Sequence, residues 1–446
     1  MTVPSTSFQQ SLCSQRKQAL SGKMIAPGDK SISHRSLILG ALASGQTCIT
    51  GLLESDDVLA TARALSGLGV IVEKSLAGEW LVTGMSGRFR PTTRELDLGN
   101  SGTGVRLLMG AITGAGGKAT LTGDSSLASR PMARILDPLA LMGARCRSDN
   151  GRLLVDMEPS PLTGIDYTPP MASAQVKSAI LLAGLGASGQ TTVREPAPTR
   201  DHTERMLPLF GGELMVEQKQ GVTVIRLSGP QALQGTEITV PGDPSSAAFA
   251  TVAGLIVPES AITIRRVMNN PARMGVYEVL QRMGAEIMLI PCGQAAGEDI
   301  VDIIVHASSL RAIDLEADIA PSMIDEYPVL AVAAAFATGT TRLRGLSELR
   351  AKESDRLAGT AKLLTTNGVD TRIDADDLII VGTGQAGPEG GGRVASHGDH
   401  RLAMSALVLG MATANPVHTD GASMIATSYP GFVADMTALG AEITPQ

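Results

Sequence analysis

Two carboxylates in the sequence stand among residues that suit acid–base chemistry. Asp325 lies beside Glu326 in the apolar segment Ser-Met-Ile-Asp-Glu-Tyr-Pro, and Glu353 lies between Lys352 and Arg356. A carboxylate beside cations stays ionised and can accept a proton, whereas one in an apolar wall can hold a proton. The sequence therefore predicts two carboxylates that divide the base and acid duties of one reaction. The alternative is that both are exposed acids at helix starts.

Basic residues gather in or beside short loops, although the chain as a whole is acidic. They are Lys30, Arg35, Arg106, Arg130, Arg200, Lys352, Arg356 and Arg401. Arginine suits this position because its planar donors match carboxylates and phosphates. We expect a small anionic substrate with more than one acidic group, with a solvated basic surface as the alternative.

The same loops open apolar helices, and they are rich in small polar residues. Their sequences are PGDKSISHR, LGNSGTG, MASAQVK, PGDPSS, MIDEYP and HGDHR. A helix start carries free N–H groups and a partial positive charge, so it can bind a phosphate or carboxylate that small residues allow to approach. Ordinary N-capping by Ser, Asp and Asn is the alternative for any one loop.

Several familiar sites are missing from the sequence. It has no phosphate loop of the G-x-x-x-x-G-K-[ST] type, no H-E-x-x-H zinc site and no G-x-S-x-G nucleophile. The four cysteines are far apart, and His397 and His400 have only Asp399 as a nearby further ligand. Hydrogen bonding within the loop is therefore favoured over a metal site at these two histidines.

Composition narrows the class of partner. The chain has 446 residues, a net charge of −7 and only 2% aromatic residues. A nucleic-acid partner is disfavoured because such proteins use basic surfaces and stacking aromatics. The longest uncharged apolar run, Val329 to Ala337, is far shorter than the ~20 residues that span a bilayer. We expect a cytoplasmic protein without a membrane or nucleic-acid partner.

The loops belong to a pattern that occurs six times. An apolar, Ala-rich helix recurs at intervals of about 70 residues, and a repeat of that period indicates one structural unit used again. The six helices are expected from His34, Thr103, Ala174, Ser245, Glu326 and His400. Each is apolar nearly all round, so each should be buried.

A second, amphipathic helix follows each buried one and ends at glycine, where a left-handed cap is expected. These glycines are Gly69, Gly143, Gly211, Gly284, Gly368 and Gly440. A β-like stretch follows both helices, so one unit reads βαβαββ. Pro27–Ser31 matches Pro241–Ser245 three units later. This predicts an α/β protein with one domain at 27–240 and another made of 1–26 and 241–446, hinged near Pro27 and Pro241.

The ordered motifs resemble one family. They are PGDKSISHR, LGNSGTGVRLL, ASRPMARIL, MASAQVKSAILLAGL, TRDHTERML, PGDPSSAAF, MIDEYPVLA, LRAKESDRL and HGDHRLAM. Together they are similar to the 5-enolpyruvylshikimate-3-phosphate synthases, from about residue 23 to 432. The resemblance implies a two-domain, inside-out barrel of six βαβαββ units around buried helices. It also implies transfer of the enolpyruvyl group of phosphoenolpyruvate to the 5-hydroxyl of shikimate 3-phosphate, in chorismate and aromatic amino-acid biosynthesis, without a metal or cofactor.

The resemblance further implies residue roles. Asp325 would take the proton of the attacking hydroxyl, Glu353 would protonate the methylene carbon, and Lys30 completes the catalytic set. Contacts to shikimate 3-phosphate would come from Lys30, Ser31, Arg35, Ser173, Ala174, Gln175, Arg200, Asp325 and Lys352. Contacts to phosphoenolpyruvate would come from Lys30, Gly102, Arg130, Gln175, Arg356 and Arg401. Domain closure would exclude water from the reaction.

Two departures from the family pattern matter. Many members carry Lys before the T-[FY]-P motif near the C-terminus, but Ile425–Pro430 has none. Tolerant members of the resembling branch carry Ala where this chain has Gly102. We therefore expect glyphosate to bind as a competitor of phosphoenolpyruvate.

Two other functions stay open at this point. The related enzyme that transfers enolpyruvate to UDP-N-acetylglucosamine shares the fold, but it has Cys in a mobile loop where this chain has Ser125–Arg130. A non-catalytic anion-binding scaffold would bind ligands without turnover. We expect a monomer that acts on small molecules.

Overall fold

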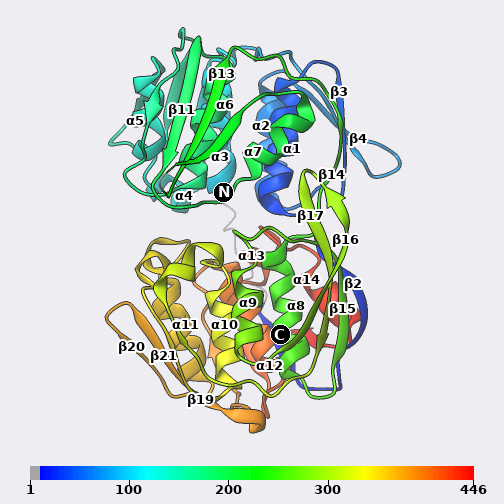
Figure 1. Ribbon diagram of the computed structural model, residues 1–446. Helices are drawn as coiled ribbons and strands as arrows, with labels where there is room; N and C mark the ends of the chain where they lie inside the picture. Colours follow the sequence, from blue (N-terminus) through cyan, green and yellow to red (C-terminus); the bar gives the residue numbers. More distant parts are fainter. Residues whose placement is uncertain (1–10, 220) are drawn as a thin grey trace, which may run out of the picture. The chain divides into compact units, whose positions relative to one another are not determined.

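Strands in this computed structural model, which describes residues 11–219 and 221–446, form six sheets of four strands each (Figure 1). In every sheet one edge strand runs parallel to its neighbour, and the next pairing along the sheet is antiparallel. The expected repeat of one α/β unit is confirmed by this common pairing pattern, although three of the sheets include one strand from a distant part of the chain.

The chain divides into two units that are described separately. Unit 1 comprises the described residues up to Pro27, together with Gly242–Gly293 and Asp299–Gln446. Unit 2 comprises Gly28–Pro241 and the short segment Gln294–Glu298. Residues 1–10 of the predicted range 1–26 lie outside the described residues.

Three sheets lie in unit 2. The first has the order β14 (Glu237–Thr239), β3 (Gln46–Thr50), β5 (Trp80–Thr83) and β4 (Ile71–Lys74). The second has the order β6 (Glu95–Asp97), β7 (Ala119–Thr122), β9 (Val155–Glu158) and β8 (Arg145–Ser148). The third has the order β10 (Asp166–Tyr167), β11 (Gly189–Glu195), β13 (Val222–Gly229) and β12 (Met215–Lys219).

The other three sheets belong to unit 1, and two of them use strands from the start of the chain. One has the order β16 (Glu286–Ala295), β17 (Glu298–His306), β15 (Ala261–Met268) and β2 (Ser21–Ile25). The next has β18 (Asp314–Leu315), β19 (Thr338–Leu343), β21 (Asp377–Thr383) and β20 (Thr371–Asp374). The last has β22 (Arg393–Val394), β23 (Val417–Thr419), β1 (Leu12–Gln15) and β24 (Glu442–Pro445).

Buried helices fill the interior of each unit, as the apolar repeats predict. Those of unit 2 are α1 (Lys30–Leu42), α3 (Gly102–Gly114) and α6 (Ala174–Gly184). Those of unit 1 are α8 (Pro244–Ile256), α10 (Tyr327–Ala335) and α12 (His400–Gly410). Figure 1 shows the strands outside these helices within each unit. Small residues let the helices approach: a Cβ on Gly110 of α3 would meet the Ala179 carbonyl oxygen of α6 at 2.2 Å.

The amphipathic helices cover the spaces between the sheets. They are α2 (Asp56–Gly67), α5 (Ala133–Leu141), α7 (His202–Met206), α9 (Gly275–Arg282), α11 (Arg356–Thr366) and α14 (Phe432–Ala438). α7 is short and continues as a 3₁₀ turn over Leu207–Phe210, because Pro208 has no N–H for the next α-helical bond. All six predicted glycine caps have positive φ, from +77° at Gly211 to +108° at Gly440.

Shorter helical pieces lie in the connections. They are α4 (Ser125–Ser129), α13 (Ala422–Ile425) and 3₁₀ turns at Ala317–Ser322, Ser347–Ala351 and Gly384–Ala386. Among the described residues, no helix combines the length and the apolar character needed to cross a bilayer.

Candidate active site

The predicted site residues of unit 2 lie at the starts of its three buried helices. Lys30 and Ser31 begin α1, Gly102 begins α3, and Ser173 caps α6 just before Ala174. The sequence pattern placed Lys30 and Ser31 in a loop, with the helix from His34. The structure starts α1 four residues earlier, because the Asp29 carboxylate accepts a hydrogen bond from the Ile32 N–H at 2.8 Å.

Arginine side chains surround the start of α3. A Cβ on Gly102 would lie 3.0 Å from Nη1 of Arg130 and 3.2 Å from Nη1 of Arg106, so both guanidiniums flank this glycine. Arg130 is held by Asn100 Oδ1 at 2.7 Å and by Ser126 Oγ at 3.2 Å. Two guanidiniums at a helix start form a site suited to an anion.

Gln175 connects the starts of α3 and α6. Its Oε1 accepts a hydrogen bond from Arg106 Nη1 at 2.9 Å, and its Nε2 donates to Thr103 Oγ1 at 3.0 Å. Ser173 accepts from the Val176 N–H at 3.4 Å, which makes it the N-cap of α6. The structure thus brings Gly102, Arg130, Ser173 and Gln175 into one region of unit 2.

Lys30 and Arg35 are held by residues that the sequence analysis did not select. Lys30 Nζ lies 2.7 Å from Asp57 Oδ2 of α2. Arg35 is almost fully buried, and it donates to Thr203 Oγ1 at 2.8 Å and to Ser178 Oγ at 2.7 Å. Burial lowers the pKa of the Arg35 guanidinium to about 10. It stays charged at neutral pH, and it joins α1 to α6 and to α7, which begins two residues after Arg200.

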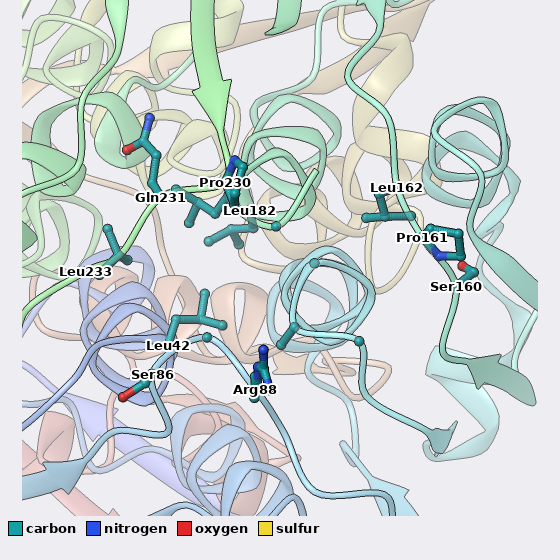
Figure 2. Close-up of a pocket in the computed structure, with 16 residues that line it drawn as sticks. Leu42, Ser86, Arg88, Ser160, Pro161, Leu162, Leu182, Pro230, Gln231 and Leu233 are labelled. Atoms are coloured by element: carbon teal, nitrogen blue, oxygen red, sulfur yellow. The ribbon is translucent and has the colours of Figure 1, made fainter. Parts of the chain in front are cut away.

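A surface hollow of about 380 Å³ lies at the opposite ends of these helices (Figure 2). Its walls include Leu42 at the end of α1, Gly114 at the end of α3, and Leu182 and Leu185 around the end of α6. The predicted substrate residues occupy the helix starts instead. This hollow is therefore not the predicted site.

Arg356 is the centre of the predicted site in unit 1. Its side chain is only 1% exposed and contacts three carboxylates. Nε lies 2.7 Å from Asp399 Oδ2, Nη1 lies 3.1 Å from Asp325 Oδ1, and Nη2 contacts Glu353. Burial acts to lower the pKa of Arg356, but the three carboxylates outweigh burial and raise it.

Asp325 and Glu353 differ from Asp399 in their access to solvent. Their side chains are 19% and 28% exposed, whereas the Asp399 side chain is fully buried. Lys352 Nζ lies 3.8 Å from Asp325 Oδ1 and 3.0 Å from Glu348 Oε1. Two accessible carboxylates on one guanidinium, with a lysine beside one of them, can accept and donate protons close together.

Asp399 was missed by the sequence analysis as a site residue. It caps α12, where its Oδ1 accepts from the Arg401 N–H at 2.9 Å, and its Oδ2 accepts from Ser354 Oγ at 3.0 Å. Although burial acts to raise it, the pKa of Asp399 is lowered by Arg356 and His400. The only available signal was its place before the apolar helix, which capping alone explains.

Arg401 lies in the first turn of α12 near the Asp325 backbone. Its Nη1 donates to the Asp325 carbonyl oxygen at 3.0 Å and approaches Glu326 Oε1 at 3.4 Å. Ile425–Pro430, the segment that lacks the expected lysine, lies beside His400, the residue before Arg401. Thr427 Oγ1 of this segment is 3.4 Å from His400 Nδ1. The structure thus gathers Asp325, Lys352, Glu353, Arg356 and Arg401 within unit 1.

One group of potential metal ligands was also missed. Atoms of Asp201, His202 and Glu298 in unit 2 lie within 4.8 Å of one another. His202 Nδ1 is 2.7 Å from Glu298 Oε1, and Arg205 Nε is 2.8 Å from Asp201 and 3.4 Å from Glu298. The guanidinium already supplies positive charge to both carboxylates, so the arrangement is that of an ion-pair network.

Comparisons with known proteins show the family of the chain. The family model described as EPSP synthase (3-phosphoshikimate 1-carboxyvinyltransferase) matches residues 14–436. Proteins named 3-phosphoshikimate 1-carboxyvinyltransferase from Maricaulis maris and Caulobacter vibrioides are 54% and 53% identical. The alignments cover 96% of this chain and 96% of the first relative, and 95% of this chain and 97% of the second.

Solved structures show the same fold. The EPSP synthase from Acinetobacter baumannii is 42% identical, with a TM-score of 0.88 over 98% of this chain and 100% of that one. The enolpyruvyl transferase NikO from Streptomyces tendae, at 20% identity, has a TM-score of 0.76 over 98% of this chain and 99% of that one, and it supports the fold alone. These matches confirm the two-domain, inside-out barrel of six units. The chain therefore belongs to the EPSP synthase family, the 3-phosphoshikimate 1-carboxyvinyltransferases.

Proposed function

We propose that Asp325 and Glu353 perform the proton transfers of the family reaction in this chain. The enzyme transfers the enolpyruvyl group of phosphoenolpyruvate to the 5-hydroxyl of shikimate 3-phosphate and releases phosphate. The observation that carries the proposal is that both carboxylates contact Arg356 and stay accessible, while the third partner, Asp399, is buried.

Asp325 acts as the base. Its contacts with Arg356 and Lys352 favour the ionised carboxylate, which can accept the hydroxyl proton as the hydroxyl oxygen bonds to C2 of phosphoenolpyruvate. Lys352, at 3.8 Å from Asp325, lies where it can hold that oxygen. Lys30 is assigned to the same step through its contacts with both substrates.

Glu353 is assigned the acid role, for which it must first bind a proton, because its contact with Arg356 favours the ionised form. It donates a proton to C3 of phosphoenolpyruvate, which turns the methylene into a methyl group. When the C2–oxygen bond to phosphate breaks, one methyl proton returns to a base and the double bond forms again. Atoms and charge balance without an added oxidant or reductant, so the proposed mechanism has no step for a metal or an organic cofactor.

The remaining cations bind the acidic groups of the substrates. Arg130 beside Gly102, Lys30 and Gln175 in unit 2, and Arg356 and Arg401 in unit 1, are assigned to phosphoenolpyruvate. Arg356 keeps capacity for a ligand, because it has more N–H groups than its contacts with three carboxylates use.

Shikimate 3-phosphate is assigned to the helix starts of unit 2. Its contacts there are Lys30, Ser31, Arg35, Ser173, Ala174, Gln175 and Arg200. Arg35 is so buried that it can offer only the edge of its guanidinium, so its main task is to hold α1, α6 and α7 in position around the ligand.

Glyphosate is proposed as a competitor of phosphoenolpyruvate. It carries a phosphonate and a carboxylate, which the same cations can bind. Gly102 leaves open the space between Arg130 and Arg106 that a side chain would enter. We also propose that the enzyme works as a monomer in the cytoplasm, the compartment of phosphoenolpyruvate.

The experiment that tests this function is release of phosphate from shikimate 3-phosphate and phosphoenolpyruvate in EDTA. We expect full turnover with EDTA, and none when UDP-N-acetylglucosamine replaces shikimate 3-phosphate. Activity that EDTA removes and Mg²⁺ restores would contradict the metal-free mechanism. Turnover of the nucleotide sugar would contradict the assigned acceptor.

A further inference from the structure

A buried cluster of charges in unit 1 connects Arg401 with residues that the mechanism above does not use. It contains Asp243, Arg273, Ser245, Glu326 and Arg401. These residues stand at helix starts: Asp243 caps α8, Glu326 is the residue before α10, and Arg401 is in the first turn of α12. The cluster therefore links three of the buried helices of the unit at their N-terminal ends.

Hydrogen bonds run through the cluster without a break. Arg273 Nη2 donates to Asp243 Oδ1 at 2.8 Å and to Ser245 Oγ at 3.1 Å. Ser245 Oγ donates to Glu326 Oε1, and the same oxygen is 3.4 Å from Arg401 Nη1. The charges alternate in sign along this path, so each group stabilises its neighbour.

Burial makes Glu326 an unusual residue at this position. Its side chain is 1% exposed, and Oε2 makes no hydrogen bond to any described residue. Burying a carboxylate costs free energy that incomplete pairing does not fully return, so Glu326 is not explained by stability alone. Glu326 faces Arg401, which is the more accessible of the two arginines in the cluster. The Arg401 side chain is 12% exposed, whereas the Arg273 side chain is 4% exposed.

The hydrogen bonds of the Arg401 guanidinium lie at one of its edges. Nη1 donates to the Asp325 carbonyl oxygen and to Glu326 Oε1, and no hydrogen bond joins Nη2 or Nε to a described residue. A free arginine side chain has many rotamers, and a ligand that fixes it must offset the loss of that side-chain entropy. A guanidinium that is already held at one edge can bind a carboxylate or phosphate at its other edge with a smaller loss of entropy.

We propose that Glu326 is a positioning residue for phosphoenolpyruvate: it holds the Arg401 guanidinium, and Ser245 and Arg273 hold Glu326 in turn. The inference rests on the proposed role of Arg401 as a ligand of that substrate. Glu326 itself touches no substrate. Its effect is on the affinity for phosphoenolpyruvate, through the orientation of Arg401.

Steady-state kinetics with both substrates varied tests this role. Glu326→Ala should raise KM for phosphoenolpyruvate roughly tenfold while KM for shikimate 3-phosphate changes less than about twofold. Glu326→Gln keeps an oxygen that can accept from Arg401, so it should recover most of the loss. Ser245→Ala should have a smaller effect in the same direction. The matched control is Ser405→Ala, which removes a buried hydroxyl from α12 one turn beyond Arg401 and should change neither constant.

The path through Arg401 is tested by a double-mutant cycle. In an Arg401→Met background, Glu326→Ala should raise KM for phosphoenolpyruvate no further, because the group that it positions is gone. The inference would be overturned if Glu326→Ala and Glu326→Gln each changed the KM for phosphoenolpyruvate and the KM for shikimate 3-phosphate by the same factor. Additive effects in the cycle would also overturn it. An Arg401→Met enzyme with normal KM for phosphoenolpyruvate would instead overturn the proposed role of Arg401. An unchanged KM for shikimate 3-phosphate reports that each variant is folded.

Discussion

Arg356 is the residue on which the proposed chemistry of unit 1 depends most. It holds Asp325 and Glu353 by its Nη atoms and is itself fixed by the buried Asp399. Because the guanidinium cannot move without breaking a buried ion pair, the two accessible carboxylates keep a defined spacing. Preorganisation of this kind reduces the reorganisation that each proton transfer requires.

Removal of Asp325 should affect turnover more than binding. We expect Asp325→Ala to lower kcat by roughly two orders of magnitude or more, because the hydroxyl proton loses its acceptor. The control is Asp318→Ala, an exposed acid in the preceding 3₁₀ turn, which should keep normal kcat. Steady-state kinetics decides: a normal kcat with a raised KM in Asp325→Ala would show that Asp325 is not the base.

A methyl group at Gly102 should weaken glyphosate binding. In Gly102→Ala the new Cβ would stand 3.0 Å from Arg130 Nη1, so this guanidinium must shift. A single misplaced methyl group can change affinity by about tenfold or more. We expect the inhibition constant for glyphosate, measured in competition with phosphoenolpyruvate, to rise by that factor, with a smaller rise in KM for phosphoenolpyruvate. An unchanged inhibition constant would contradict the assigned site.

Sequence reasoning found the site residues to different extents. The contact of Glu353 with Arg356 follows from their spacing of three positions before a helix. The contact of Asp325 with Arg356 spans 31 positions, and no local pattern predicts it. Asp57, Thr203 and Ser245 were missed as partners because a polar residue near a helix start is fully explained by local capping or solvation until its distant neighbour is known.

At the scale of elements, Asp399 joins the starts of α11 and α12. We expect Asp399→Asn to lower the free energy of unfolding at pH 7 by about 3 kcal/mol, because it leaves Arg356 without its buried counter-charge. The pKa of Asp399 is lowered in the folded state, so its contribution is present above about pH 4 and is lost as the pH falls below that. In urea denaturation, the difference in the free energy of unfolding between wild type and variant should become smaller at acidic pH.

The control for this prediction is Asp355→Asn. Asp355 also caps a helix, but it is exposed and its nearest cation, Arg350, lies 3.6 Å away. This substitution should cost less than about 1 kcal/mol. Equal losses for the two variants would mean that Asp399 stabilises the unit through capping alone.

The glycine after α9 gives a second test at this scale. Gly284 has φ of +91°, and a Cβ there would have only the Ser309 carbonyl oxygen near it, at 3.7 Å. Gly284→Ala should therefore cost about 1 kcal/mol from backbone strain, and Gly284→Asn should cost less because Asn tolerates left-handed φ. Thermal unfolding measures both. A loss for Asn as large as that for Ala would contradict this explanation.

Elements were more predictable than side-chain contacts. The alternation of an apolar helix, a strand and an amphipathic helix ending at glycine repeats six times, so each copy supports the interpretation of the others. The start of α1 was missed because Lys30, Ser31 and Ser33 are polar, and the apolar pattern begins only at His34. The 3₁₀ turn after α7 results from Pro208. A repeat pattern does not predict it, because it depends on one residue that only this copy carries at that position.

At the scale of the molecule, the sequence repeats predict six sheets, but they do not predict which sheets β1 and β2 join. β1 lies in the same sheet as β23 and β24, and β2 pairs with β15. Neither pairing has a local signal, because a short strand such as Leu12–Gln15 can join any open edge. Exposed edges are a hazard for self-association, and β16 carries Pro291, which offers no N–H to a further strand.

We therefore expect a monomer in solution. Light scattering after size exclusion should give a mass near 46.1 kDa that does not change with protein concentration. The wild-type chain should keep the same specific activity on dilution. A mass near twice this value would contradict the expectation.

The pairing of β1 with β24 also sets an order of events during synthesis. The Gln446 N–H donates to the Ser11 carbonyl oxygen at 2.9 Å, and Leu12 faces Pro445 across the sheet. β1 leaves the ribosome early, yet its neighbours are made hundreds of residues later, and domains otherwise fold as they emerge. The edge of that strand must stay unpaired while Gly28–Pro241 is translated. A chaperone that shields it in the meantime would increase the yield of folded enzyme, and a nascent chain stopped before Val417 would lack both partners.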